Sequence, residues 1–193
     1  MRRLIIPGLL ILALVLAGCG KAPAQAALKV ADEAIAKIKP EAEKYVPEEF
    51  AKLSEAATNA KARFDEGKYG EALARAQEIP VKANDVAIAA KMKKDDLTRK
   101  WAAVQDSMPA TVQELTTKVG ALASAKKLPK GFDKTQLETA KTSLADVTAG
   151  WTAAGEAFTG GDLHGALSKA DSAKTRAEEL KKALEAAPAP AKK

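Results

Sequence analysis

Residues 137–158 read LETAKTSLADVTAGWTAAGEAF, and their apolar side chains recur at helical spacing. The large apolar residues come every seven positions, and three of them are followed three positions later by a smaller one. The first set is Leu137, Leu144, Trp151 and Phe158, and the second is Ala140, Val147 and Ala154. This pattern is typical of a coiled-coil seam, with one apolar stripe along an amphipathic helix. We therefore expect a long helix packed against other helices.

The rest of the chain repeats this pattern, and no segment alternates apolar and polar residues as a half-buried strand would. Further seams are Phe50, Leu53, Ala57, Ala60 and Phe64; Val112, Leu115, Val119 and Leu122; and Leu163, Ala170, Ala177 and Leu184. The helices are expected at about 28–45, 47–66, 69–107, 109–127, 133–159 and 162–186. The sequence thus predicts an all-α fold, an elongated antiparallel helical bundle.

Helix ends are indicated by capping residues. Pro47 followed by two glutamates fits a first helical turn, and Asp133 with Gln136 resembles a capping box. Gly67 and the pair 160–161 can adopt the positive φ that ends a helix. Two further prolines fall within periodic stretches. We expect a kink at Pro80 and a break between two helices at Pro109.

The two halves of the chain resemble each other. FDEGKYGEALARA (64–76) aligns without a gap with FTGGDLHGALSKA (158–170), and the segment 46–50 aligns with 128–132. All four Phe residues of the chain occupy these paired positions. We expect the bundle (28–186) to consist of two related long helical hairpins, 46–107 and 128–186, of which the second has the longer first helix.

Composition excludes many kinds of site. The 193 residues include 43 Ala, eight aromatic residues, one Cys and one His. One Cys forms no intrachain disulfide or multi-thiolate metal site, and one His excludes multi-His sites. High Ala, Lys and Glu content is typical of long helices. No cofactor is expected.

The first 18 residues have the pattern of a signal peptide. Arg2 and Arg3 precede an apolar run from Leu4 to Leu16 that is short for a membrane-spanning helix. The run ends in Leu16, Ala17, Gly18 and Cys19, a sequence that resembles the lipobox of bacterial lipoproteins. An ordinary secretory signal or an uncleaved anchor would be the alternatives.

The lipobox resemblance implies that the sulfur of Cys19 receives a diacylglyceryl group, that the chain is cut before Cys19, and that the new amino group is usually acylated (for example with palmitate). Cys19 would then be a membrane anchor rather than a catalytic thiol, and residues 19–27 a lipidated spacer. The next residue, Gly20, is not Asp. In a Gram-negative organism this implies the periplasmic face of the outer membrane.

The remaining charges do not point to nucleic acid. The full chain has a net charge of +6, but the leader holds two of the 31 basic residues and no acidic one. The chain from Cys19 onward therefore has 29 basic and 25 acidic residues, of alternating sign as in KMKKDDLTRK (91–100). A nucleic-acid binder would need a basic stripe with aromatic residues free to stack.

Other candidate residues favour structural roles. His164 is expected to be an exposed polar residue rather than a general base, and Trp101 and Trp151 to pack in the core rather than line a ligand pocket. Asp95 and Asp96 are adjacent on a helix and face different ways, so a solvated pair is expected rather than a metal site. Phosphate-loop, nucleophile-elbow, haem-attachment and zinc-protease motifs are absent from the sequence, which predicts no enzymatic activity.

Two resemblances bear on the bundle. The motif F-x-x-G-x-[YL]-x-x-A-L-x-x-A, built on Gly67 and Gly161, resembles the turn of tetratricopeptide repeats, although its two copies lie 94 residues apart. The lipobox, the Pro-Glu-Glu-Phe helix start at 47–50 and the turn at 67–73 together resemble an uncharacterised family of small helical bacterial lipoproteins. That resemblance implies no particular activity.

We therefore expect a lipid-anchored envelope lipoprotein, a helical interaction or structural module held by the acyl chains on Cys19 and facing an envelope protein partner. One alternative is an envelope tether bonded to peptidoglycan through Lys193, at the end of an extended, mobile tail (187–193). A peptide-binding helical-repeat adaptor is the other.

Overall fold

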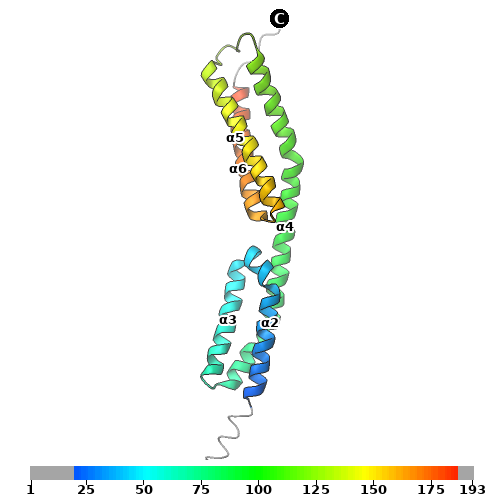
Figure 1. Ribbon diagram of the computed structural model, residues 1–193, viewed down its shortest axis with the longest axis vertical. Helices are drawn as coiled ribbons and strands as arrows, with labels where there is room; N and C mark the ends of the chain where they lie inside the picture. Colours follow the sequence, from blue (N-terminus) through cyan, green and yellow to red (C-terminus); the bar gives the residue numbers. More distant parts are fainter. Residues whose placement is uncertain (1–19, 187–193) are drawn as a thin grey trace, which may run out of the picture. The chain divides into compact units, whose positions relative to one another are not determined.

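The computed structural model describes residues 20–186, which form five α-helices and no strand (Figure 1). They are α2 (Lys21–Tyr45), α3 (Pro47–Asp65), α4 (Tyr69–Ser124), α5 (Lys134–Thr159) and α6 (Leu163–Glu185). Helices α2 and α3 pack antiparallel, as do α5 and α6. The predicted all-α fold with antiparallel helices is confirmed.

The chain divides into two units, and the boundary lies within α4 between Lys94 and Asp95. The described part of the N-terminal unit is residues 20–94, and that of the C-terminal unit is residues 95–186. Each unit contains two whole helices and one part of α4.

The core of the N-terminal unit draws on all three of its helical segments. Its buried residues are Leu28, Ala31, Leu53, Ala57, Ala60, Ala76, Ile79 and Ala83. Phe64 and Val86 are partly buried against this cluster. Most of these positions hold Ala, so the helices approach closely while burying little area for each residue.

The core of the C-terminal unit contains more large side chains. Its buried residues are Met108, Leu115, Val119, Phe132, Leu137, Ala140, Val147, Ala173, Ala177, Leu180 and Leu184. Along α5 the smaller residues of the seam, such as Val147, are fully buried, whereas Leu144 and Trp151 are only partly buried and Phe158 is 36% exposed. The buried line of α5 is therefore centred on the smaller residues of the predicted seam.

The turns after α3 and α5 are closed in the same way. Gly67 (φ +77°) and Gly161 (φ +78°) hold the left-handed conformation. The main-chain N–H groups of Gly67, Lys68, Gly161 and Asp162 donate to the carbonyls of Phe64, Arg63, Phe158 and Ala157 respectively. This is a helix C-cap of the Schellman type, and it confirms the glycine ends predicted at positions 67 and 161.

The predicted helix starts are also confirmed. Pro47 stands at the first position of α3 with Glu48 and Glu49 in the same turn. Asp133 caps α5 in a capping box, in which its side chain accepts from the Gln136 N–H while the Gln136 side chain accepts from the Asp133 N–H. Helix α5 thus begins where side chains satisfy its first N–H groups, whereas α3 begins at a proline, which has no N–H group to satisfy.

The break predicted at Pro109 is wrong, because α4 continues through Pro80 and Pro109. The segment predicted as a separate helix at 109–127 is the last part of α4. Met108 and Leu115 are fully buried on either side of this proline. Their packing keeps the helix together despite the lost main-chain hydrogen bond and the ring clash, which cost about 3 kcal/mol.

The spacer expected at 20–27 is helical. Helix α2 begins at Lys21, and the Ala24 N–H donates to the Gly20 carbonyl over 3.2 Å. Ala24 is fully buried, and Leu28 belongs to the core of the unit. Small-residue content suggested a linker, but the spacing of Ala24, Leu28 and Ala31 already follows a helical stripe.

Replacing Leu115 by Ala should destabilise the C-terminal unit by about 2–5 kcal/mol, since it empties a fully buried position in the core. Urea unfolding followed by tryptophan fluorescence measures this unit, because both tryptophans lie in it. The control Thr117→Ala, at an exposed position of the same helix, should change stability by about 0.5 kcal/mol or less. Equal effects of the two variants would contradict the described packing.

Gly67→Ala should destabilise the N-terminal unit by about 1–2 kcal/mol, because an L-residue at φ +77° is strained. No heavy atom lies within 4 Å of the added methyl, so backbone strain is the sole cost. The matched variant Gly70→Ala, in α4 and equally open, should stabilise by about 0.5–1 kcal/mol. Urea unfolding followed by circular dichroism tests whether the two variants change the free energy of unfolding in opposite directions.

Candidate functional site

The residues predicted to carry function lie at or beyond the ends of the described chain. Cys19 and the lipobox residues Leu16, Ala17 and Gly18 precede the first described residue, Gly20. Lys193 and the tail 187–193 follow the last one. The structure therefore informs the predicted anchor only through the residues that follow Cys19, beginning with Gly20.

Gly20 already belongs to the folded N-terminal unit. A Cβ atom built on Gly20 would lie 3.2 Å from the Cβ of Tyr69, so the chain here passes close to the start of α4. Four residues later Ala24 is fully buried. The start of α2 and the α3–α4 turn thus lie at one end of the unit, which we call the anchor end (residues 20–24 and 63–71) (Figure 1).

Two aromatic rings close the anchor end. Phe64 and Tyr69 stand on either side of the turn and meet edge to face, with their centroids 5.1 Å apart and their planes at 62°. Both rings are partly buried. Tyr69 thus packs across the turn, and the edge-to-face geometry suits the charge distribution of the rings.

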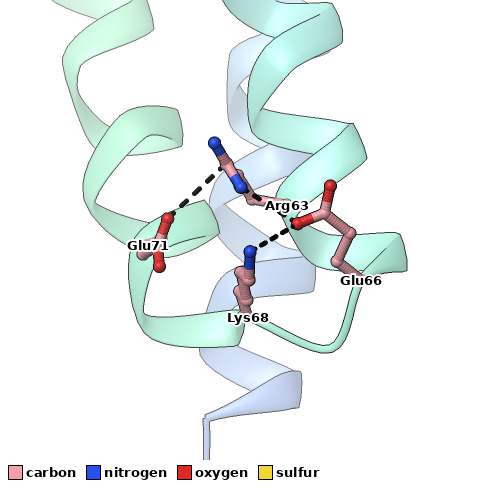
Figure 2. Close-up of polar contacts among 4 residues, drawn as sticks. All are labelled: Arg63, Glu66, Lys68 and Glu71. Carbon is pink, nitrogen blue, oxygen red and sulfur yellow. Dashed lines mark hydrogen bonds and ion pairs between the residues drawn. The ribbon is translucent and has the colours of Figure 1, made fainter.

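A charged network covers the same turn (Figure 2). Glu66 Oε2 accepts from Lys68 Nζ over 2.8 Å and from Arg63 Nη1 over 3.0 Å, and Arg63 Nε lies 3.5 Å from a carboxylate oxygen of Glu71. The hydrogen bonds from Lys68 and then Arg63 lower the pKa of Glu66 below its ordinary value of 4.5. All four side chains are more than a third exposed, so solvent weakens each pair. This network was not predicted from the sequence, although the spacing of Arg63 and Glu66 (i, i+3) could have indicated one of its pairs.

The C-terminal unit has two hollows between α5 and α6. The first, of about 500 Å³, is lined by Phe132, Leu180 and Leu184 among others, and the second is about 560 Å³. Asp146 and Arg176 line both hollows and are joined by an ion pair of 3.2 Å. These linings mix apolar, hydroxyl and charged groups along an open groove.

The expectation that the tryptophans pack in the core is confirmed for Trp101, which is 3% exposed. Its ring stacks on Trp151 (centroids 5.5 Å apart, planes at 18°) and on Phe158 (4.7 Å, 11°). Trp151 itself is partly buried. The Trp101 indole N–H is buried without a hydrogen-bond partner among the described residues, an unfavourable arrangement that the surrounding packing has to offset.

The other candidate residues are separated. His164 is exposed in the first turn of α6, and Leu163 beside it is buried. Asp96 is engaged by Lys100 over 2.9 Å and by Arg99 over 3.8 Å. Between residues 20 and 186 no three His, Cys, Asp or Glu side chains gather closely enough to hold a metal ion. None of the helices in the same range is both long and apolar enough to cross a bilayer.

The stabilising effect of the Glu66 network should disappear in acid. Because the pKa of Glu66 is lower in the folded protein, its contribution is fully present above pH 4.5 and is lost as the pH falls through the folded value. Glu66→Gln should therefore be less stable than the wild type at pH 7, and the difference should shrink below pH 4.5. Urea midpoints measured from pH 7 to pH 3 test this.

The control for that series is Glu55→Gln, which removes a carboxylate from an exposed position of α3 outside the network. Its effect should not follow the pH dependence of the Glu66 variant. A difference between Glu66→Gln and the wild type that persists unchanged to pH 3 would contradict the ion pairs described.

Comparison with known proteins gives no relative: no family model, no curated protein and no solved structure matches the chain.

Proposed function

We propose that the protein is a lipid-anchored lipoprotein of the bacterial cell envelope that serves as a helical interaction or structural module and not as a catalyst. The observation that carries the proposal is the position of the chain's one cysteine. Cys19 ends the sequence Leu-Ala-Gly-Cys directly after a short apolar run, and helix α2 begins at Lys21, two residues later. A lipid anchor needs this arrangement, whereas a catalytic thiol would need a built site around the sulfur.

The energetics of acylation suit this role. Each buried CH₂ of an acyl chain contributes about 0.8 kcal/mol, so two or three chains on one residue hold a protein on a membrane almost permanently. The anchor would keep the two helical units at the envelope while their surfaces stay free for a protein partner. If the organism is Gram-negative, Gly20 after the anchor favours the outer membrane.

The surface of the described part supports a contact role. Ion pairs cross between helices at several exposed places, for instance Lys61 with Asp32 and Lys94 with Glu41. The groove between α5 and α6 adds an apolar floor flanked by Asp146 and Arg176. Interfaces between proteins that also exist separately are about as apolar as the rest of a protein surface, so a mixed surface of this kind is compatible with a contact role.

We also propose that the hairpins α3–α4 and α5–α6 are related copies. The turn hydrogen bonds of the first hairpin recur 94 residues later in the second. Buried positions keep the same register, in the pairs Ala72 and Ala166, Ala76 and Ala170, Ile79 and Ala173, Ala83 and Ala177, and Ala90 and Leu184. Similar packing at a constant offset is what duplication of one hairpin would leave.

Lipidation is tested on the full chain expressed with its own leader in a bacterium. Mass spectrometry should find a polypeptide that begins at Cys19 and carries acyl groups, and the protein should partition with membranes. Cys19→Ser should leave the protein in the aqueous fraction, whereas Lys21→Ala, which keeps the sulfur, should not. An unmodified sulfur or a retained leader in the wild type would refute the proposed function.

A further inference from the structure

We infer that the anchor end of the N-terminal unit is its membrane-contact surface: the α3–α4 turn and the start of α2 stand against the lipid headgroups of the bilayer that holds Cys19. The inference rests on the lipidation proposed above and deepens it, because it names the part of the protein that meets the lipid.

The first argument is the length of the connection. Consecutive Cα atoms lie about 3.8 Å apart, so the Cα of Cys19 is within about 4 Å of that of Gly20. Gly20 is held by the hydrogen bond from Ala24 and by its close approach to Tyr69. A free spacer of eight residues would have allowed about 28 Å of reach at about 3.5 Å a residue. The described chain has no such spacer between Cys19 and the fold.

The second argument is that the α3–α4 turn lies at the same end of the N-terminal unit as the start of α2. Helix α3 runs from Pro47, at the end of the unit opposite the anchor end, to Asp65, just before the α3–α4 turn (Figure 1). Tyr69, the residue after Lys68, approaches Gly20 at the start of α2. Residues 48 and 65 are separated by about 26 Å along the helix, at about 1.5 Å a residue. An acyl group on Cys19 therefore keeps the anchor end at the membrane surface and leaves the opposite end of the unit untethered.

The third argument is the chemistry of the anchor end. Its charged residues are three basic and three acidic ones, namely Lys21, Arg63, Lys68, Asp65, Glu66 and Glu71. Both carboxylates in the network are already engaged by Arg63 or Lys68. A surface of balanced charge is not repelled by zwitterionic or anionic headgroups and does not need anionic lipid to approach them. The covalent tether, rather than charge attraction, would hold the surface in place.

The experiment places a fluorophore at either end of the acylated full-length protein in phosphatidylcholine vesicles. Once Cys19 is acylated, Lys68→Cys provides a labelling site at the anchor end, and Glu48→Cys provides the matched site at the far end; both positions are exposed. A lipid with a spin-labelled headgroup quenches only fluorophores close to the membrane surface. The label at position 68 should be quenched several-fold more than the label at position 48.

A second variant tests whether the short connection is the cause. Twenty Gly and Ser residues inserted between Gly20 and Lys21 give the anchor a typical reach of about 25 Å. Quenching at the two positions should then become similar. A difference between the labels that survives the insertion would overturn the argument from tether length.

The outcomes separate this inference from the proposed function. An acylated protein whose labels at 68 and 48 are quenched equally would overturn the membrane-contact surface and leave the lipid anchor standing. A wild-type protein without acyl groups on Cys19 would overturn both. Addition of anionic phosphatidylglycerol to the vesicles should change the ratio of quenching at position 68 to quenching at position 48 only a little. A strong increase in this ratio would show that charge attraction, and not the tether, holds the surface at the membrane.

Discussion

Alanine at buried positions sets the distance between neighbouring helices in both units. Residues with no more than 1% exposure include Ala24, Ala60, Ala72, Ala76, Ala154, Ala166, Ala170, Ala173 and Ala177. A methyl group lets two helices approach to the short end of the usual 8–10 Å range but removes little apolar area from water. The stability of each unit must therefore come from many small contacts kept in register along long helices. A single larger side chain at these positions would push two helices apart over several turns.

Because alanine contributes so little area, a few larger side chains have a disproportionate effect. Ile79 in the N-terminal unit and Met108, Leu115 and Val147 in the C-terminal unit are the largest side chains that are fully buried. Two partly buried aromatic residues, Phe64 and Tyr69, instead close the anchor end. The C-terminal unit even accepts a buried indole N–H without a partner to keep the Trp101 ring stacked. Packing area there outweighs the unmade hydrogen bond.

Periodicity and capping residues predicted the helical class, the starts at Pro47 and Asp133 and the glycine turns, because these depend on neighbours in sequence. They failed at Pro109, where burial of Met108 and Leu115 from other helices decides the outcome, and at residues 20–27, where the contacts of Ala24 and Leu28 with the rest of the unit do. The lipobox could be read from local sequence alone. The charged network at Arg63 could not, since its link to Glu71 exists only once the turn has folded.

The continuity of α4 across the boundary at residues 94 and 95 has an energetic consequence. Each unit contains one part of α4. When one unit unfolds completely, the part of α4 that belongs to the other unit loses main-chain hydrogen bonds at the boundary. Fraying at such a junction costs helical residues on both sides, so part of the free energy of each unit depends on the other being folded. The shared helix thus couples the stabilities of the two units, as in adjoining repeats of a repeat protein. Unfolding of one unit then favours unfolding of the other.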